Sequence, residues 1–317
     1  MPLHPQVEAH LTRLSAVNLA GLHTVSPQQA REGAHRLTAA SIREVESVAE
    51  VTDRLVTTTV GELRIRIYRP TLTRNAASPV AVFFHGGGYV LGDIESHDAL
   101  VRSLANAAEM VVISVDYPLA PEHKYPAQVN AGLAATEWIA DHSDELGVDA
   151  DRLAVVGDSA GGNLAATVAL NARDAGGPRV AFQALIYPDL DFRRENESIT
   201  RLAGNYGNIT REAQTWFMDH YLDSREQRLD PRVSPLLEPD LRGLPATYII
   251  TAEYDALRDE GEQYGNRLRQ AGVPVTVRRY DGMIHEFLRH PFDDARTAIV
   301  ELATAVREGI AKGEVSR

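Results

Sequence analysis

The sequence contains no cysteine among its 317 residues. Disulfide bonds, cysteine nucleophiles and thiolate metal sites are therefore excluded. Long apolar runs are also missing, because no stretch approaches the roughly 18 residues that a membrane-spanning helix needs. The N-terminal segment lacks the unbroken apolar core of a signal peptide. We therefore expect a soluble, cytoplasmic protein with no membrane partner.

Lysine is nearly absent, since Lys124 and Lys312 are the only two and arginine carries almost all the positive charge. Acidic residues outnumber lysine and arginine by 44 to 32, and the formal net charge is −12. This charge argues against nucleic acid as a partner, because phosphate backbones attract clustered positive charge. Hydrophobic residues make up 44% of the chain, which is enough for a large core.

The N-terminal segment, residues 1–50, has a helical pattern. Ser26 precedes a proline, as at the start of a helix. Apolar residues recur there at helical spacing, namely Val7, Leu11, Leu14 and Val17. We expect this segment to form a helical cap.

Residues 51–317 alternate strand-like and helical segments and are expected to form the catalytic domain. Two alternating runs flank Gly61, which marks a hairpin turn, and later runs such as VAVFFH and MVVISVDY suit strands buried on both faces. The pattern predicts an α/β fold with a mainly parallel sheet of eight strands and helices on both faces. A polar stretch at about 189–244 interrupts the alternation and is expected to be a cap insertion above the sheet.

Ser159 lies in the sequence VVGDSAGG, between an apolar run and a helical segment. Residues 157–161 match G-x-S-x-G, in which a serine occupies a sharp turn from strand to helix. Ser159 is predicted to be a nucleophile, and the neighbouring Asp158 is expected to point away from its hydroxyl. The alternatives are a glycine turn that only caps the helix, or a phosphate loop, which would require a nearby lysine.

A serine nucleophile needs a histidine to accept its proton. In this type of fold the chain order is serine, acid, histidine. The histidines that follow Ser159 are His220, His285 and His290. His285 is the predicted base, because it comes directly after the last expected strand and thus at the same edge of the sheet as the serine.

The histidine in turn needs a carboxylate to orient it and to stabilise its charged form. Asp255 ends the preceding expected strand and is the predicted acid. Asp259 is the second candidate and Glu253 the third. Alternatively, Asp255 is only the N-cap of the helix that follows, and it could serve both purposes.

Three successive glycines follow a buried apolar run in FFHGGGY. Backbone N–H groups without side chains beside them can approach a ligand closely, as in an oxyanion hole. Gly87 and Gly88 are the predicted donors, together with the N–H of Ala160 after the nucleophile. Gly86 is expected to shape the turn and His85 to order the loop through hydrogen bonds.

Together these motifs resemble the hormone-sensitive-lipase family of the α/β-hydrolase fold, in its bacterial esterase branch. The matching segments are HGGGY at 85–89, DYPLAPEHKYPA at 116–127, GDSAGGNLA at 157–165, DALRDEG at 255–261 and DGMIHEF at 281–287. Two positions depart from the family, because Tyr89 stands where tryptophan or phenylalanine is common and Pro118 where arginine is frequent.

The resemblance implies a serine carboxylesterase with the triad and oxyanion donors named above and with no metal or cofactor. It implies small-molecule esters of short to medium acyl chain length as substrates, hydrolysed through an acyl-enzyme. The expected substrate contacts are Tyr89, Tyr187, Tyr206 and Phe217, although core packing is an equally good interpretation of Phe217.

The motifs are compatible with other functions. An amidase, deacetylase or lactonase would use the same triad. Plant hormone receptors of this fold have lost the catalytic histidine, whereas His285 is present here. An edge strand near TYIITAE at 247–253 could also pair two copies into a homodimer.

Overall fold

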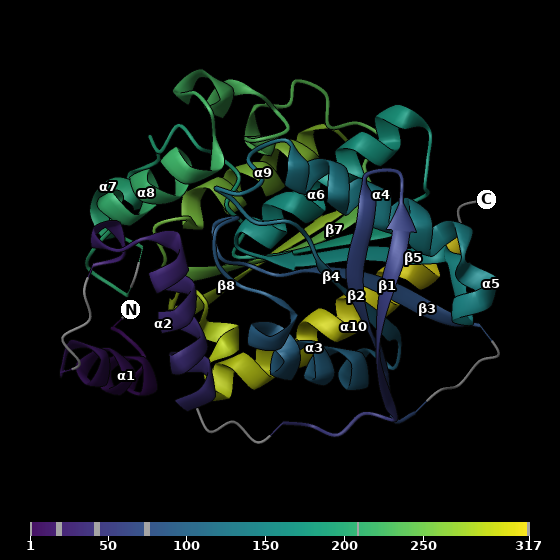
Figure 1. Cartoon of the computed structure of the whole chain (residues 1–317), viewed down its shortest axis with the longest axis horizontal. Coiled ribbons are helices and arrows are strands. Elements are labelled where there is room, and N and C mark those ends of the chain that lie inside the picture. The colour runs from purple at the N-terminus through teal and green to yellow at the C-terminus, as the bar shows by residue number, and fades with distance from the viewer. Residues whose placement is uncertain (1, 17–20, 41–44, 73–76, 208, 316–317) are drawn as a thin grey trace.

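The computed structural model describes residues 2–16, 21–40, 45–72, 77–207 and 209–315 (Figure 1). Val17, one of the apolar positions above, lies outside them. A single sheet has the strand order β1-β2-β4-β3-β5-β6-β7-β8. The strands are β1 (Glu50–Thr58), β2 (Gly61–Arg69), β3 (Ser78–Phe84), β4 (Val111–Asp116), β5 (Val148–Asp158), β6 (Phe182–Ile186), β7 (Ala246–Tyr254) and β8 (Val275–Ile284).

The predicted eight-stranded, mainly parallel sheet is confirmed. β1 and β2 form the expected hairpin, in which Thr58 pairs with Gly61, and β2 runs antiparallel to β4. All pairings from β4 through β3 and on to β8 are parallel. The carboxyl ends of β5, β7 and β8 therefore lie at one edge of the sheet, where Ser159, Asp255 and His285 follow them directly.

Helices cover both faces of the sheet (Figure 1). α3 and α10 pack on one face, and α4, α6 and α9 pack on the other. The helices around the sheet are α3 (Ile94–Ala108), α4 (Ala127–Asp141), α5 (Ser143–Leu146), α6 (Ala160–Ala175), α9 (Arg258–Gln270) and α10 (Asp293–Val315). A short 3₁₀ helix, η4 (Phe287–Arg289), precedes α10.

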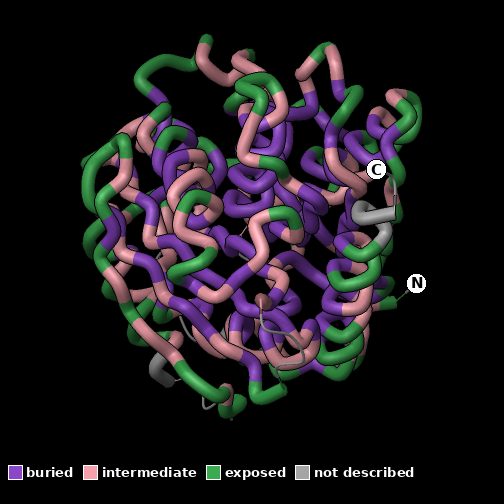
Figure 2. The backbone as a smooth tube through the Cα atoms, turned by 90° about the vertical axis from the view of Figure 1, so that its right-hand side faces the viewer, coloured by how far each residue is buried: buried purple, intermediate pink, exposed green. Residues whose placement is uncertain are grey.

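Figure 2 shows that the buried residues form a continuous interior under an exposed outer layer. Strands β3 to β7 have runs with almost no exposed residue, such as Val80–Phe84 in β3 and Leu153–Asp158 in β5. Strands buried on both faces explain why the sequence runs are continuously apolar rather than alternating. A large, rigid core on each side of the sheet fixes the strand ends that carry the site.

The N-terminal segment contains α1 (Pro5–Ala16), η1 (Leu22–Thr24) and α2 (Pro27–Ala40). Ser26 begins α2 as expected, because its Oγ accepts from the N–H of Gln29 at 3.3 Å and the side chain of Gln29 accepts in return. The insertion contains α7 (Glu197–Leu202), α8 (Arg211–Tyr221), η2 (Arg225–Leu229) and η3 (Pro235–Leu237). η1 packs against α8, so the two parts that were expected to form a cap are in contact.

The prediction that residues 247–253 form an edge strand is wrong. These residues belong to β7, which lies inside the sheet between β6 and β8. The edges are formed by β1 and β8 instead. A strand with both neighbours present has no free backbone groups to pair with a second copy.

No helix within the described residues combines the length and the apolar composition needed to cross a membrane.

Candidate active site

Ser159 occupies a strained turn between β5 and α6. Its φ of 55° and ψ of −119° lie in a region that residues with a side chain rarely adopt. A Cβ on Gly157 would overlap the backbone of Gly161, and a Cβ on Gly161 would overlap the carbonyl oxygen of Phe84. The two glycines therefore allow the tight approach that the G-x-S-x-G pattern predicts.

The structure brings Ser159, Asp255 and His285 together. Nε2 of His285 lies 3.0 Å from Oγ of Ser159, and Nδ1 lies 2.7 Å from Oδ2 of Asp255. Asp255 and His285 are buried, and Ser159 is 8% exposed. Such a chain of hydrogen bonds is the arrangement that activates a serine hydroxyl.

Asp255 has two partners, but the N-cap of α9 is Leu257, so the interpretation of Asp255 as the N-cap is wrong. Its Oδ2 contacts His285, whereas its Oδ1 accepts a hydrogen bond of 2.8 Å from the N–H of Leu257 at the start of α9. The second bond fixes the carboxylate in the orientation that His285 requires.

The other candidate acids and bases face elsewhere. Asp259 accepts from the N–H of Ser198, and Glu253 accepts from the N–H of Gly282. His220 lies on α8 with Nδ1 2.7 Å from the carbonyl oxygen of Trp216, and the ring of His290 packs against that of His10.

Burial and Asp255 change the pKa of His285 in opposite directions. Burial disfavours the charged imidazole, but the charge and hydrogen bond of Asp255 outweigh it and raise the pKa of His285 from 6.5 to about 9. The surroundings of His285 therefore stabilise its charged imidazolium form.

The glycine loop after β3 has a left-handed backbone at three successive residues. The φ values are 125° at Gly87, 61° at Gly88 and 64° at Tyr89. Among the described residues, no hydrogen bond uses the N–H groups of Gly87, Gly88 or Ala160. These groups are thus available as donors at the turn that holds Ser159.

Asp158 connects the nucleophile turn to the glycine loop. Its Oδ1 accepts a hydrogen bond of 2.8 Å from the N–H of Gly86, and a Cβ on Gly86 would lie only 2.7 Å from Oδ2. Nε2 of His97 lies 3.2 Å from Oδ1 and 3.3 Å from Oδ2. Asp158 thus faces away from the Ser159 hydroxyl and fixes the distance between the two loops.

His85 holds the glycine loop in place through hydrogen bonds and ring stacking. Its Nδ1 lies 2.9 Å from the carbonyl oxygen of Gly86, its carbonyl oxygen accepts a hydrogen bond of 2.6 Å from the hydroxyl of Tyr117, and the two rings are stacked. Burial, together with the charge of the neighbouring His97, lowers the pKa of His85 to about 4. His85 is therefore neutral at physiological pH and contributes through packing and hydrogen bonds.

Tyr89 and Tyr187 are buried behind the site rather than exposed to a substrate. Tyr89 is 0% exposed, its ring stacks on Tyr221, and its hydroxyl donates to Oδ1 of Asn163 at 2.7 Å. Tyr187 is 1% exposed and its ring centroid lies 4.9 Å from that of His285. In this structure both residues support the site, which differs from the substrate contacts that we expected.

Tyr206 and Phe217 are partly exposed and belong to the insertion. The ring of Tyr206 packs on that of Tyr254, at the end of β7. The ring of Phe217 lies so close to Gly88 that a Cβ on this glycine would overlap it. The aromatic ring of Phe217, on α8, therefore lies directly against the glycine loop.

Sequence reasoning missed two buried polar residues at the site, His97 and Asn163. His97 looks like an ordinary helix residue, because only the folded structure places the first turn of α3 beside Asp158. Asn163 donates to the carbonyl oxygens of Asp189 and Val233 at 2.6 and 2.8 Å. The asparagine in an otherwise small and apolar helix start, GGNLAA, was the available signal.

Within the described part of the chain, no group of three or more histidine, aspartate or glutamate side chains has an arrangement that could hold a metal ion.

The fold and this site define an α/β protein with a serine, a histidine and an aspartate at the carboxyl ends of its strands. The family model for the alpha/beta hydrolase fold matches residues 81–289. The chain belongs to this family of α/β hydrolases, which confirms the resemblance that the motifs indicated.

Named relatives agree with this assignment. The chain is 45% identical over 248 residues to the carboxylic ester hydrolase LipN of Mycobacterium tuberculosis, a match that covers 75% of this chain and 64% of LipN. It is 36% identical over 291 residues to an arylesterase of Saccharolobus solfataricus, covering 92% of this chain and 94% of the arylesterase. A solved structure of a hyperthermophilic esterase from the archaeon Pyrobaculum calidifontis has a TM-score of 0.93 and 39% identity, with 97% of this chain and 99% of that chain covered.

Proposed function

We propose that the protein is a serine carboxylesterase that hydrolyses small-molecule esters through an acyl-enzyme. The observation that carries the proposal is the position of His285, with Nε2 at 3.0 Å from the Ser159 hydroxyl and Nδ1 at 2.7 Å from Asp255. The names of the relatives, which include carboxylic ester hydrolase, arylesterase and ethyl acetate hydrolase, support the same reaction.

In the first half of the reaction, the neutral His285 takes the proton of Ser159 at Nε2 while Oγ attacks the ester carbonyl carbon. Asp255 holds Nδ1–H and stabilises the imidazolium that forms. The oxygen of the tetrahedral intermediate accepts hydrogen bonds from Gly87, Gly88 and Ala160, whose N–H groups have no partner within the described residues. His285 then gives its proton to the leaving alcohol, and the acyl group remains on Ser159.

The second half repeats these steps with water as the nucleophile. His285 takes a proton from the water, the hydroxide attacks the acyl carbon, and the proton returns to Oγ as the carboxylic acid leaves. No group beyond the protein and water is needed to balance this sequence.

The substrates we propose are esters with short to medium acyl chains. Phe217 packs against Gly88 and therefore stands beside the position where the carbonyl oxygen of the substrate would bind. Phe217 and Tyr206 are the proposed aromatic contacts from the insertion, with Tyr89 and Tyr187 supporting the site from behind. The cytoplasmic location and the homodimer stay predictions.

The alternatives differ in what they require of the site. An amidase, deacetylase or lactonase would use the same three side chains, and the names of the relatives favour esters instead. A receptor that binds but does not react has no need of an imidazole held between a serine and a buried carboxylate, so the contacts of His285 favour an enzyme.

The test combines a substrate series with a serine-reactive probe. Nitrophenyl esters from acetate to palmitate measure chain-length preference, with a nitroanilide of the best acyl group as the amide comparison. The S159A variant should lose turnover and labelling by a fluorophosphonate but keep its circular dichroism spectrum. Turnover that persists in folded S159A would refute the proposal.

A further inference from the structure

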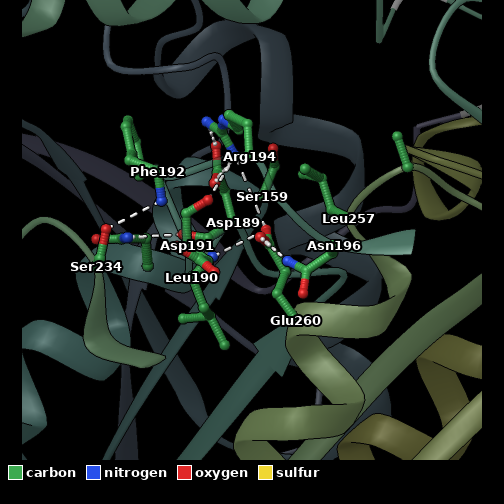
Figure 3. A network of polar contacts seen from close by, with 12 residues as sticks. Ser159, Asp189, Leu190, Asp191, Phe192, Arg194, Asn196, Ser234, Leu257 and Glu260 are labelled. Carbon is green, nitrogen blue, oxygen red and sulfur yellow. Dashed lines mark hydrogen bonds and ion pairs between the residues drawn. The ribbon is translucent and has the colours of Figure 1, made fainter. Parts of the chain in front are cut away.

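A buried network of charged and polar groups lies where the insertion leaves the sheet (Figure 3). Glu260 in the first turn of α9 is 0% exposed, and Asp189 and Asp191 are also buried. Charged side chains are rarely placed in a protein interior without a specific role, because removing a charge from water is costly. The reaction proposed above does not use any of these groups.

Glu260 is the centre of this network. Its Oε1 accepts a hydrogen bond of 3.0 Å from the N–H of Leu190 and lies 3.9 Å from Nη1 of Arg194, and its Oε2 is 3.4 Å from Nδ2 of Asn196. Burial, reinforced by the charge of Asp189, raises the pKa of Glu260 well above its usual range. A single α9 side chain therefore contacts three residues at the beginning of the insertion.

The segment that Glu260 holds, residues 189–190, is also bonded to the turn that carries Ser159. The N–H of Asp189 donates to the carbonyl oxygen of Ser159 at 3.2 Å. The Asp189 carboxylate is bound by both terminal nitrogens of Arg194, at 2.5 and 2.8 Å. Figure 3 shows Asp189 close to Ser159 and Arg194, with Glu260 reaching the same segment from α9.

The segment that carries Glu260 also carries the acid of the triad. Asp255 lies five residues earlier, and its Oδ1 and its carbonyl oxygen accept hydrogen bonds from the N–H groups of Leu257 and Arg258. The start of α9 is thus a short, hydrogen-bonded unit with Asp255 at one end and Glu260 at the other. A shift of Glu260 relative to Leu190 would move this unit relative to Ser159.

We propose that Glu260 is a positioning residue, which holds residues 189–190 and thereby sets the distance between the Ser159 turn and the Asp255 loop. The inference rests on the proposed function, because it concerns the geometry of that triad. His285 connects the side chains of the serine and the acid, and Glu260 connects the segment that carries the acid to residues 189–190, which bond to Ser159. In a triad, a misplacement of about 1 Å can cost 100-fold in rate.

Ser198 provides a matched control across the same seam between the insertion and α9. It is fully buried, its Oγ donates to the carbonyl oxygen of Ala256 at 2.7 Å and accepts from the N–H of Asp259 at 3.2 Å. It does not contact residues 189–190 or the nucleophile turn in these bonds. Its removal should weaken the packing of α7 without moving Ser159.

The experiment compares E260A, E260Q and S198A with the native enzyme. Titration with a fluorophosphonate counts active sites, initial rates with nitrophenyl butyrate give kcat and KM, and thermal unfolding gives Tm. E260A leaves the N–H of Leu190 without an acceptor and should lower kcat per active site about 10- to 100-fold, with a smaller change in KM. E260Q keeps an acceptor oxygen and should restore most of kcat. S198A should lower Tm and lower kcat less than E260A does, because Ser198 also bonds to the unit that carries Asp255 but its removal keeps the bond between Glu260 and Leu190.

A purely structural role for Glu260 gives a different result. In that case E260A lowers Tm as S198A does and keeps kcat per active site within about threefold of the native value, which overturns the proposal. If E260A does not fold, E260D replaces it in the same comparison, because it withdraws the carboxylate by one methylene. Failure of the proposed function is distinguishable, since the native enzyme would then neither turn over esters nor react with the fluorophosphonate.

Discussion

Asp158 illustrates how one side chain can hold together the two loops that carry the proposed nucleophile and the proposed oxyanion donors. It lies next to Ser159 but accepts from the N–H of Gly86 and pairs with His97. Burial by itself would raise the pKa of Asp158, but the charge and hydrogen bond of His97 lower it overall. The carboxylate therefore stays ionised, and it holds the glycine loop at a fixed distance from the nucleophile.

The pKa of His285 leads to a prediction about pH. Only the neutral imidazole can accept the proton of Ser159, so kcat/KM should fall as the pH falls through the pKa in the folded enzyme. Because this pKa is raised from 6.5 to about 9, the midpoint should lie well above 6.5. Rates with nitrophenyl butyrate between pH 5 and 10, corrected for spontaneous hydrolysis, measure the midpoint.

Two variants test whether Asp255 is the residue that raises the pKa of His285. D255N removes the charge that raises the pKa, so its residual activity should have a midpoint at lower pH and be about 10⁴-fold weaker. D259N changes a nearby carboxylate that faces Ser198 and should leave the midpoint unchanged. A midpoint of kcat/KM at or below pH 6.5 in the native enzyme contradicts this account.

The charged His285–Asp255 pair also stabilises the fold. This contribution is fully present below pH 6.5 and is lost as the pH rises through about 9.

At the scale of elements, the site depends on how closely α6 and β5 approach the loop after β3. Gly161 makes this approach possible, because a Cβ there would overlap the carbonyl oxygens of Phe84 and His85. The backbone cannot give way without moving the nucleophile turn and the glycine loop apart. We therefore predict that G161A destabilises the protein by about 3 kcal/mol or more and removes most activity.

Gly33 in α2 offers the matched substitution. A Cβ at Gly33 would meet only the end of the Arg36 side chain, at 3.9 Å, and α2 has ordinary helical backbone. G33A should therefore stabilise the protein by up to about 1 kcal/mol, because alanine is the better helix former. Denaturant unfolding of both variants measures the difference, and equal stabilities for G161A and G33A would contradict the steric argument.

Most of the elements could be predicted from the sequence because each has a local signal. Continuous apolar runs predicted the inner strands, Gly61 predicted the hairpin, and Ser26 with Pro27 predicted the start of α2. The order of strands across the sheet has no local signal. For that reason the segment at 247–253 was assigned to an edge, although β7 is an inner strand.

At the scale of the whole molecule, the sequence predicted the residues that carry known motifs and missed those that support them. Ser159, Asp255 and His285 each end or follow a strand, so their meeting at one edge could be expected. His97 lies outside these motifs, and Glu260 lies inside DALRDEG, but both are positioned by packing between distant segments, which the motifs do not reveal. Tyr89 and Tyr187 show the converse, since their sequence positions near the expected site did not reveal that their side chains are buried.

The N-terminal segment is coupled to the site through Arg31 on α2. Its Nε donates to the carbonyl oxygen of Val90 at 2.8 Å and its Nη2 to that of Ala120 at 2.7 Å, and it also pairs with Glu122. Val90 follows the glycine loop directly. Arg31 thus fixes α2 to two loops that meet beside the proposed oxyanion hole.

We predict that R31A releases α2 from these loops. The loss of two hydrogen bonds from a charged donor should cost about 1–3 kcal/mol, increase KM for nitrophenyl butyrate, and speed proteolytic cleavage N-terminal to β1. R36A changes an exposed arginine on the same helix and should affect none of these. Thermal unfolding, steady-state kinetics and limited proteolysis followed by mass spectrometry measure the three effects. If R31A and R36A are cleaved at the same rate and have the same KM, α2 is not held on the site by Arg31, and the packing of η1 on α8 remains as a contact between the N-terminal segment and the insertion.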